Sequence, residues 1–382
     1  MDRFYRQFET ELGQLREAGK FRELRTIDCA GAVARYEGRD YRNFSGNDYL
    51  GVAGDLELRR EFYREVGPLG LSAASSRLLT GNSPQYASLE AALAKWYGHG
   101  RAALVFNSGY HANLGILPAL SRKGDLILSD KLNHASIIDG LRLAEADFKR
   151  YPHGDLARLE ALLAEAARED RRVFIVTESI FSMDGDRIDL AGLVKLKQRY
   201  GAFLIVDEAH SVGVTGPTGA GLAEAENLIG EIDIIVGTFG KAFGSAGAYA
   251  ILAPVAKEYL VNTMRPLIFT TGLPPVIAAW SEFVIGRIPA MNERRVHLAK
   301  LGDRLRQVTA ARSFRTIGDS QIVPLIVGGD RDALELAAKL RERGILVFAI
   351  RPPTVPAGTA RLRFSLNAAL SEQDIESVEA AL

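Results

Sequence analysis

The sequence lacks the residues that mark several classes of protein. Its 382 residues include a single cysteine, Cys29, so no disulfide can form within the chain and nothing indicates an oxidising compartment. Lys and Arg together number 47, and so do Asp and Glu. Because this balance lacks the basic excess typical of nucleic-acid or anionic-membrane binding, we expect neither partner.

Long apolar runs are also missing. The uncharged stretches 242–256 and 266–281 are rich in Gly, Pro, Ser or Thr and fall short of the roughly 20 residues of a membrane helix. The first 20 residues carry charges throughout and lack the apolar region of a secretory signal. The histidines show no close pair with metal-ligand spacing. We therefore expect a cytoplasmic protein with no metal site and no membrane partner.

From about residue 85, strand-like apolar runs alternate with helical segments. The runs 173–177 and 203–206 are uninterrupted and bounded by charge, as expected for strands buried on both faces. The segment 155–167 begins with a capping Asp and places its leucines on one helical face. This alternation predicts an α/β fold with a mostly parallel sheet covered by helices on both sides.

The pattern changes near residue 285, where long helices and then a shorter α+β pattern replace the alternation. We predict an N-terminal helix with short strands (1–44), a large domain (45–285) and a smaller α+β C-terminal domain (286–382). The spacing of Phe4, Phe8 and Leu12 predicts an amphipathic opening helix, which we expect to pack with the C-terminal domain.

Small, hydroxyl and charged residues follow five of the predicted strands at the points where each one ends. Ligands of open parallel sheets bind at these carboxyl ends. The stretches are 107–111, 130–134, 178–185, 207–211 and 237–241. We therefore expect one site to contain side chains from all five.

Part of this set suits a phosphate. Ser108, Thr238 and the backbone N–H groups of Gly109 and Tyr110, at the start of a helix, are oriented donors of the kind that bind anions.

The remaining residues suit an aromatic aldehyde. Asp207 ends a buried strand and is expected to have a cationic partner. Lys241 lies in a loop of small residues and is a candidate imine-forming amine. His134 presents a flat face to a ring. Each residue alone is more often structural, but together they describe pyridoxal 5′-phosphate (PLP). The sequence contains no P-loop, serine-hydrolase elbow or complete calcium loop.

Over nearly its whole length the chain resembles the α-oxoamine synthases, which are PLP enzymes of fold type I. The matching stretches are 43–51, 76–81, 106–110, 134–137, 177–186, 206–210, 237–244 and 271–275. The resemblance implies that Lys241 forms the covalent link to PLP and that Asp207 binds the pyridine nitrogen. It also implies that His134 stacks on the ring and that His210 contacts the ring hydroxyl.

The resemblance implies further contacts. Those to PLP come from Ser108, Gly109, Tyr110, Glu178, Ser182 and Thr238, and from Thr270 or Thr271 reaching the phosphate of a partner subunit. Those to substrate come from Arg22, Asn47, His134, Arg351, Thr354 and Arg363. Among these we prefer Arg363 for the α-carboxylate of the amino acid, because its bidentate fork suits that group. Family members share active sites between two subunits, so we expect a homodimer.

The stretch 349–363 is most similar to family members of biotin biosynthesis, which condense L-alanine with a pimeloyl thioester of CoA or of a carrier protein. Two other family activities stay open, the condensation of glycine with acetyl-CoA and that of serine with a long acyl chain. An alternative of another class is a catalytically silent binding subunit.

Overall fold

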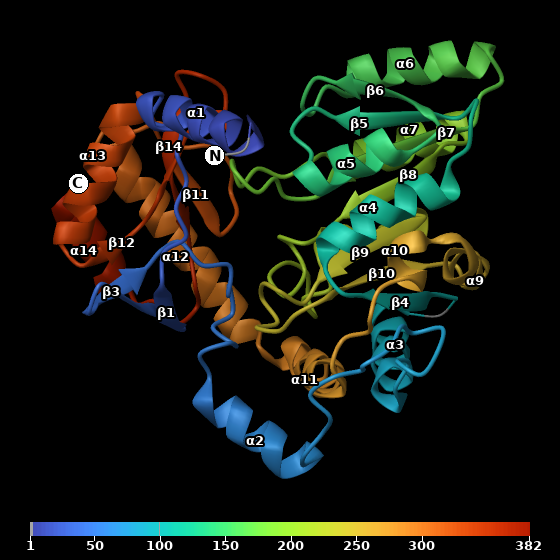
Figure 1. Ribbon diagram of the computed structural model, residues 1–382, viewed down its shortest axis with the longest axis horizontal. Helices are drawn as coiled ribbons and strands as arrows, with labels where there is room; N and C mark the ends of the chain where they lie inside the picture. Colours follow the sequence, from blue (N-terminus) through green and yellow to red (C-terminus); the bar gives the residue numbers. More distant parts are fainter. Residues whose placement is uncertain (1–2, 99) are drawn as a thin grey trace.

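The larger lobe of the molecule is built on one mostly parallel sheet (Figure 1). The computed structural model describes residues 3–98 and 100–382. The sheet has seven strands in the order β4 (Ala102–Phe106), β10 (Ala248–Leu252), β9 (Ile234–Thr238), β8 (Phe203–Asp207), β7 (Val173–Glu178), β5 (Leu126–Asp130) and β6 (Asp147–Tyr151). Strand β10 runs antiparallel to the other six strands, which are parallel to one another. The predicted sheet is therefore confirmed.

Helices cover both faces of this sheet and form a core with each face. Successive residues of a strand point to opposite faces and so enter different cores. Val173 and Ile175 enter one core, whereas Phe174 and Val176 enter the other. The first core contains α3 (Pro84–Tyr97), α6 (Leu156–Arg168), α7 (Leu190–Tyr200), α8 (Leu222–Ala225) and α11 (Pro275–Ile285). The second contains α4 (Gly109–Leu120), α5 (Ala135–Leu143), α9 (Pro254–Thr263) and α10 (Arg265–Ile268).

The smaller lobe joins the two ends of the chain. Its three-stranded antiparallel sheet has the order β11 (Ile322–Gly328), β14 (Ala360–Ser365) and β13 (Ala349–Ile350). A four-stranded sheet consists of β1 (Ile27–Ala30), β2 (Val33–Tyr36), β3 (Arg39–Asn43) and β12 (Ile345–Leu346). The lobe also contains the helices α12 (Asn292–Ala311), α13 (Asp330–Glu342) and α14 (Glu372–Ala381). Because β12 pairs with β3, the first strands lie with the C-terminal elements. The boundaries at residues 44 and 285 stay a prediction.

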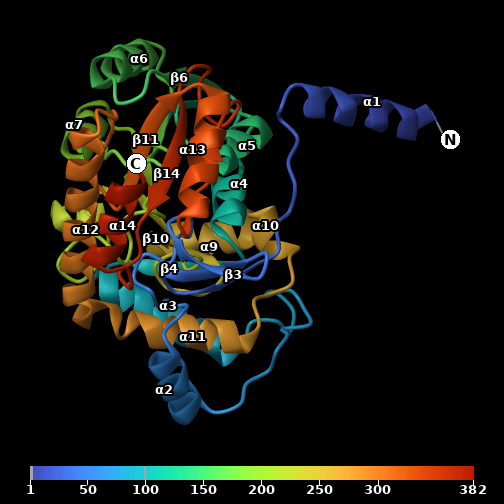
Figure 2. The same ribbon diagram turned by 90° about the vertical axis from the view of Figure 1, so that its left-hand side faces the viewer.

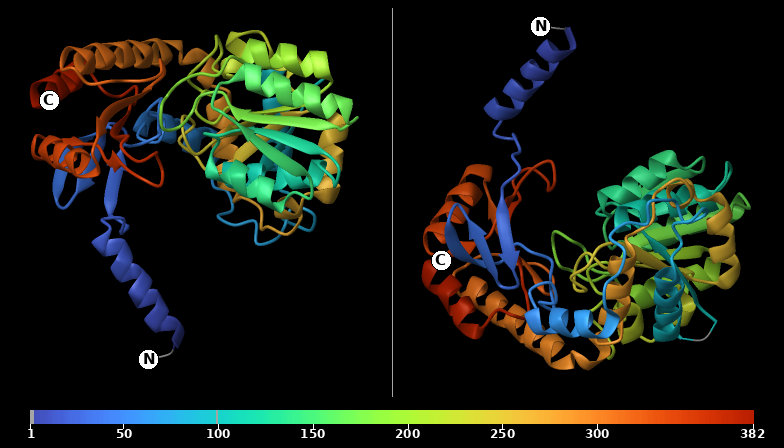
Figure 3. Two further views of the ribbon diagram at one scale, coloured as in Figure 1. Left: turned by 90° about the horizontal axis from the view of Figure 1, so that it is seen from above. Right: turned by 60° about the horizontal axis from the view of Figure 1, so that its bottom comes forward.

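The first helix, α1 (Arg3–Glu17), projects away from both lobes (Figures 2 and 3). Its described residues include no buried side chain, so the expectation that it packs with the C-terminal domain is wrong for this chain. Periodicity identifies an apolar helical face but not the surface that covers it.

A second helix, α2 (Leu56–Val66), was not predicted and packs on α11, where the rings of Phe62 and Trp280 are 5.2 Å apart. Among the described residues, no helix combines the length and the apolar character needed to cross a bilayer.

Candidate active site

The polar stretches that follow β4, β5, β7, β8 and β9 meet at the carboxyl edge of the large sheet, next to the small lobe. Strand β14 reaches this edge, since Arg363 Nε donates to the carbonyl of Ser182. Gln321, which directly precedes β11, donates from Nε2 to the carbonyl of His210 at 2.8 Å. The site therefore lies between the two lobes.

Lys241 places a buried amine in this site. Its Nζ lies 2.9 Å from His210 Nε2. Burial lowers the pKa of Lys241, and the nearby charges of Asp207 and Glu178 oppose the shift without reversing it. Burial, together with the charge of Lys241, also holds the pKa of His210 well below its ordinary value. The arrangement brings together an amine that is more reactive than that of an ordinary lysine and a neutral imidazole.

A chain of hydrogen bonds leads from Lys241 to the small lobe. A neutral His210 that accepts from Lys241 at Nε2 carries its proton on Nδ1 and donates it to Tyr49 Oη, 2.6 Å away. Tyr49 Oη in turn donates to Asn47 Oδ1 at 3.2 Å. Both terminal nitrogens of Arg363 lie 3.4 Å from the same oxygen. Asn47 Oδ1 is thus the acceptor that Tyr49 and Arg363 share at the end of these hydrogen bonds.

Asp207, at the end of β8, is held by neutral donors. Its Oδ2 accepts from Asn113 Nδ2 at 2.7 Å, and its Oδ1 accepts from the backbone N–H of Ala209 at 2.9 Å. Among the described residues no cationic side chain forms an ion pair with Asp207, so the expected cationic partner is absent as a direct contact. The carboxylate is thus oriented and buried, with the charge of Lys241 acting on it at longer range.

His134 is fixed as the N-cap of α5. Its Nδ1 lies 2.8 Å from Ser136 Oγ, and Asn113 Nδ2 donates to the same hydroxyl at 3.1 Å. The backbone N–H of His134 donates to Glu178 Oε1 at 2.6 Å. Burial lowers the pKa of His134, whereas burial followed by the charge of Asp207 raises the pKa of Glu178. An uncharged, oriented imidazole is the form that suits contact with an aromatic ring.

The start of α4 and the end of β9 form a cradle for an anion. Ser108 is the N-cap of α4, and its Oγ accepts from His111 N at 3.2 Å. A Cβ added to Gly109 would lie 3.9 Å from Thr238 Cβ, so glycine leaves room between the helix and the strand. The N-terminal N–H groups of a helix and the Thr238 hydroxyl are suitable donors for a phosphate.

The other predicted cofactor residues lie around this cradle. Tyr110 packs edge-on to His134 with ring centroids 6.4 Å apart, and its hydroxyl donates to Asp139. The carbonyl of Thr271 accepts from Asn107 Nδ2 at 2.7 Å. Thr271 is exposed and Thr270 half-buried. Both threonines lie on the segment between α10 and α11.

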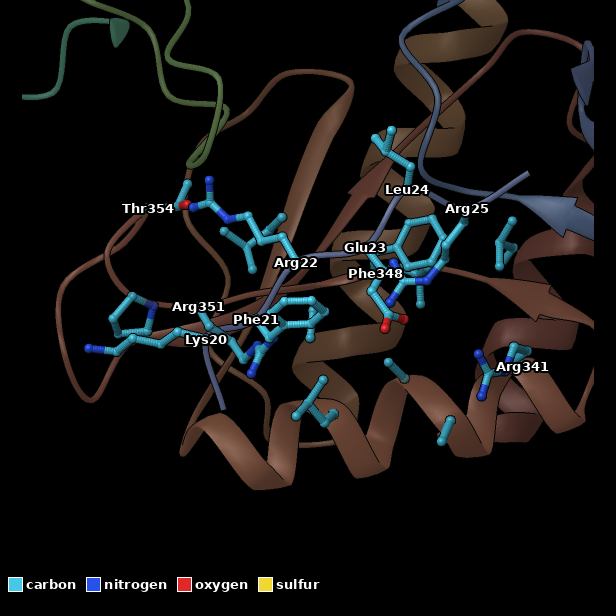
Figure 4. Close-up of a pocket in the computed structure, with 18 of the residues that line it drawn as sticks. Lys20, Phe21, Arg22, Glu23, Leu24, Arg25, Arg341, Phe348, Arg351 and Thr354 are labelled. Carbon is cyan, nitrogen blue, oxygen red and sulfur yellow. The ribbon is translucent and has the colours of Figure 1, made fainter. Parts of the chain in front are cut away.

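The predicted substrate residues fall into two groups. Asn47 and Arg363 belong to the central site described above. Arg22, Arg351 and Thr354 instead line a cavity of about 690 Å³ in the small lobe (Figure 4).

Three residues of the site were missed by sequence reasoning. Tyr49 lies in the matching stretch 43–51, so its position was available, but the hydrogen bond to His210 was not. Asn113 lies in the second turn of α4, which begins at Gly109, and this places it near the sheet edge. Gln321 carries no sequence signal, because its contact depends on how the two lobes meet.

Comparison with known proteins agrees with this geometry. Residues 39–382 match the model of the family described as aminotransferase class I and II, and the chain belongs to that family. It is 52% identical over 379 residues to the 8-amino-7-oxononanoate synthase of Chlorobaculum parvum, covering 97% of this chain and 96% of the relative. Within the family, the chain is thus one of the α-oxoamine synthases.

Two solved structures show the same fold. A serine palmitoyltransferase of S. paucimobilis, bound to a PLP–myriocin adduct, aligns with a TM-score of 0.90 and 31% identity, covering 100% of this chain and 97% of its own. The 8-amino-7-oxononanoate synthase of Francisella tularensis aligns with a TM-score of 0.74 and 30% identity, covering 88% and 96%. PLP is the cofactor of this family, and the donor set around Asp207, Lys241 and Thr238 fits it.

Proposed function

We propose that the protein condenses L-alanine with a pimeloyl thioester to give 8-amino-7-oxononanoate, carbon dioxide and the free thiol, a step of biotin biosynthesis. The observation that carries the proposal is the buried amine of Lys241 within electrostatic range of the buried carboxylate of Asp207, in a chain 52% identical to an 8-amino-7-oxononanoate synthase. Bound PLP supplies an electron sink that stabilises negative charge at the Cα of the amino acid.

Each residue of the site has a role that its surroundings support. Lys241 would hold the cofactor covalently and, when free, take the Cα proton at Nζ, for which its lowered pKa is suited. Asp207 would keep a proton on the pyridine nitrogen, because an oriented carboxylate favours the positive ring. His134 would lie against the ring. His210, held by Lys241 and Tyr49, would contact the ring hydroxyl.

Substrate binding would use the guanidinium of Arg363. A planar fork binds a carboxylate through two parallel hydrogen bonds, and both terminal nitrogens of Arg363 already face one acceptor, Asn47 Oδ1. The α-carboxylate of alanine would take over that acceptor role.

We propose that the working form is a homodimer. Thr271 is exposed, and it forms a strand-like bridge with Ser76. Large apolar side chains are exposed near these two positions, with 78% of Leu79 and 70% of Phe269 accessible. Apolar groups of this size are typical of surfaces that a partner covers. Sedimentation at micromolar concentration should give twice the mass of the chain, and a monomer would contradict this part of the proposal.

The activity is tested by the mass of the product after incubation of the PLP-loaded protein with alanine and pimeloyl-CoA. Glycine with acetyl-CoA and serine with palmitoyl-CoA are run in parallel, because the serine palmitoyltransferase neighbours share the fold. One methyl group distinguishes alanine from glycine and contributes only about 1–3 kcal/mol to selectivity, so kcat/KM values must be compared. Preferential turnover of glycine with acetyl-CoA, or of serine with palmitoyl-CoA, would overturn the proposal.

A further inference from the structure

The imidazole of His210 has a protein partner at each of its two nitrogens. Nε2 lies 2.9 Å from Lys241 Nζ, and Nδ1 lies 2.6 Å from Tyr49 Oη. Only 5% of His210 is exposed to solvent, and Tyr49 is fully buried. A buried polar group without a partner is costly, so the side chains around the ring decide where its proton lies.

The ring of His210 carries no net charge. Besides Tyr49, the titratable groups that act on it are Lys241, which follows β9, Arg363 on β14 and His134 at the start of α5. Burial and then the charges of these three groups lower the pKa of His210. A neutral imidazole has one proton, on either Nδ1 or Nε2, and the other nitrogen presents a lone pair.

Arg363 sets the direction of the hydrogen bonds that reach His210. A guanidinium donates hydrogen bonds and accepts none, so the Asn47 atom 3.4 Å from both of its terminal nitrogens must be the side-chain oxygen. Tyr49 Oη lies 3.2 Å from that oxygen and donates its single proton there. Tyr49 is then the acceptor of its bond with His210, which places the ring proton on Nδ1. Nε2 is left with a lone pair directed toward Lys241.

This lone pair faces the position at which PLP is linked to the protein. The hydroxyl of PLP is on the ring carbon next to the one that carries the aldehyde, so it lies beside the nitrogen of Lys241 in the linked cofactor. Nε2 is at hydrogen-bond distance from that nitrogen and is thus within reach of the hydroxyl. A lone pair accepts a proton from a hydroxyl but cannot donate to an oxygen anion.

We propose that Tyr49, with Asn47 behind it, is a positioning residue that holds the lone pair of His210 on Nε2 and so favours bound PLP with its hydroxyl protonated. In the competing form the same proton has moved from the oxygen to the linking nitrogen, and no other bond differs. The inference goes beyond the proposed function, because it concerns the protein with PLP alone and does not depend on the amino acid or the acyl donor.

The test compares the absorbance of the PLP-loaded wild type with that of Tyr49→Phe, without substrate. The form with the proton on oxygen absorbs in the near ultraviolet, and the form with the proton on nitrogen absorbs in the visible. In Tyr49→Phe the proton of His210 is no longer held on Nδ1, so Nε2 can donate to the oxygen anion. The ratio of near-ultraviolet to visible absorbance should therefore fall by about tenfold, because a hydrogen bond to a charged oxygen is gained.

The matched control is Tyr249→Phe, which removes another fully buried hydroxyl, 2.9 Å from Tyr97 Oη, and should leave the ratio as in the wild type. Asn47→Ala removes the acceptor of Tyr49 and should change the ratio in the same direction as Tyr49→Phe, so it serves if that variant does not fold. A ratio that is unchanged or higher in the folded variants, or an equal fall in Tyr249→Phe, would overturn the inference.

Nitrogen NMR of the cofactor-free wild type, with 15N-labelled histidine, tests the first step without any substitution. The signals of His210, identified by their loss in His210→Gln, should show a protonated Nδ1 and an unprotonated Nε2. A proton on Nε2 would overturn the inference. Neither measurement needs product formation, so a protein that gives the expected spectra but makes no 8-amino-7-oxononanoate would contradict the proposed function alone.

Discussion

His153 is expected to act as a charged clamp between two carboxylates, and its removal should destabilise the protein in a pH-dependent way. Its Nδ1 lies 3.0 Å from Asp130 Oδ1 and its Nε2 lies 2.7 Å from Asp186 Oδ2. Burial disfavours the charged ring, but the hydrogen bonds of the two carboxylates outweigh burial and raise the pKa of His153 to about 10. The ring is therefore protonated at neutral pH.

The size of the effect follows from this pKa. A rise from 6.5 to about 10, at about 1.36 kcal/mol per pH unit, corresponds to at most about 5 kcal/mol. Because 28% of the His153 side chain is exposed, solvent screening reduces this to about 2–3 kcal/mol. The folded-state pKa is the higher one, so the contribution is complete below about 6.5 and is lost as the pH rises through about 10.

Urea unfolding of the wild type and of His153→Gln, from pH 6 to pH 10.5, measures this contribution. The difference in free energy of unfolding should be about 2–3 kcal/mol near pH 6, should fall progressively as the pH rises above about 6.5, and should be gone above about 10. The variant Asp186→Asn is the matched control, because the effect of His153→Gln should be smaller in its background. A difference independent of pH, or a His153 NMR resonance that titrates near 6.5, would refute the reasoning.

Four further substitutions test the site and the loop beside it. Asp207→Asn keeps the shape of the side chain but removes its charge. We therefore expect PLP to bind more weakly and kcat/KM to fall by at least about 100-fold, whereas Asn113→Ala should have a smaller effect on both. Equal effects of the two substitutions would contradict the larger role given to Asp207. Tyr49→Phe leaves His210 Nδ1 without its hydrogen-bond partner, so the free energy of unfolding measured by urea titration should fall by about 1–3 kcal/mol. An unchanged urea midpoint of unfolding would show that this hydrogen bond does not contribute to stability. Gly185 has a φ of +69°, and Gly185→Ala would place a Cβ 2.2 Å from a carbonyl oxygen of β11. The melting temperature of the variant should therefore fall by several degrees, and unchanged melting would rule out this close approach.

Elements with a strong local signal were predicted to within a residue or two. Strand β7 was expected over 173–177 and spans Val173–Glu178, because an unbroken apolar run can be buried on both faces. The spacing of Ser371 and Asp374 is that of a capping box, and α14 begins there: Ser371 Oγ accepts from Asp374 N at 3.3 Å and Asp374 Oδ2 accepts from Ser371 N at 2.8 Å.

Elements that depend on a neighbour were missed or misassigned. Strand β6 contains charged, exposed residues without alternation, and it is a strand because it pairs with β5 at the sheet edge. The apolar run 346–349, taken by itself, favours a single strand. The structure instead places β12 and β13 in two different sheets, because their partners are β3 and β14.

The amino-acid sequence by itself determined which strand ends carry polar residues and, from the residue types there, that the site suits PLP. Hydrophobic periodicity and capping act within short segments, so they can be read locally. Only the tertiary structure decided that Tyr49 meets His210, 161 positions away, and that cations from both ends of the chain line one cavity. Such contacts depend on how the whole chain packs, because each pairs groups whose own segments would accept many other partners.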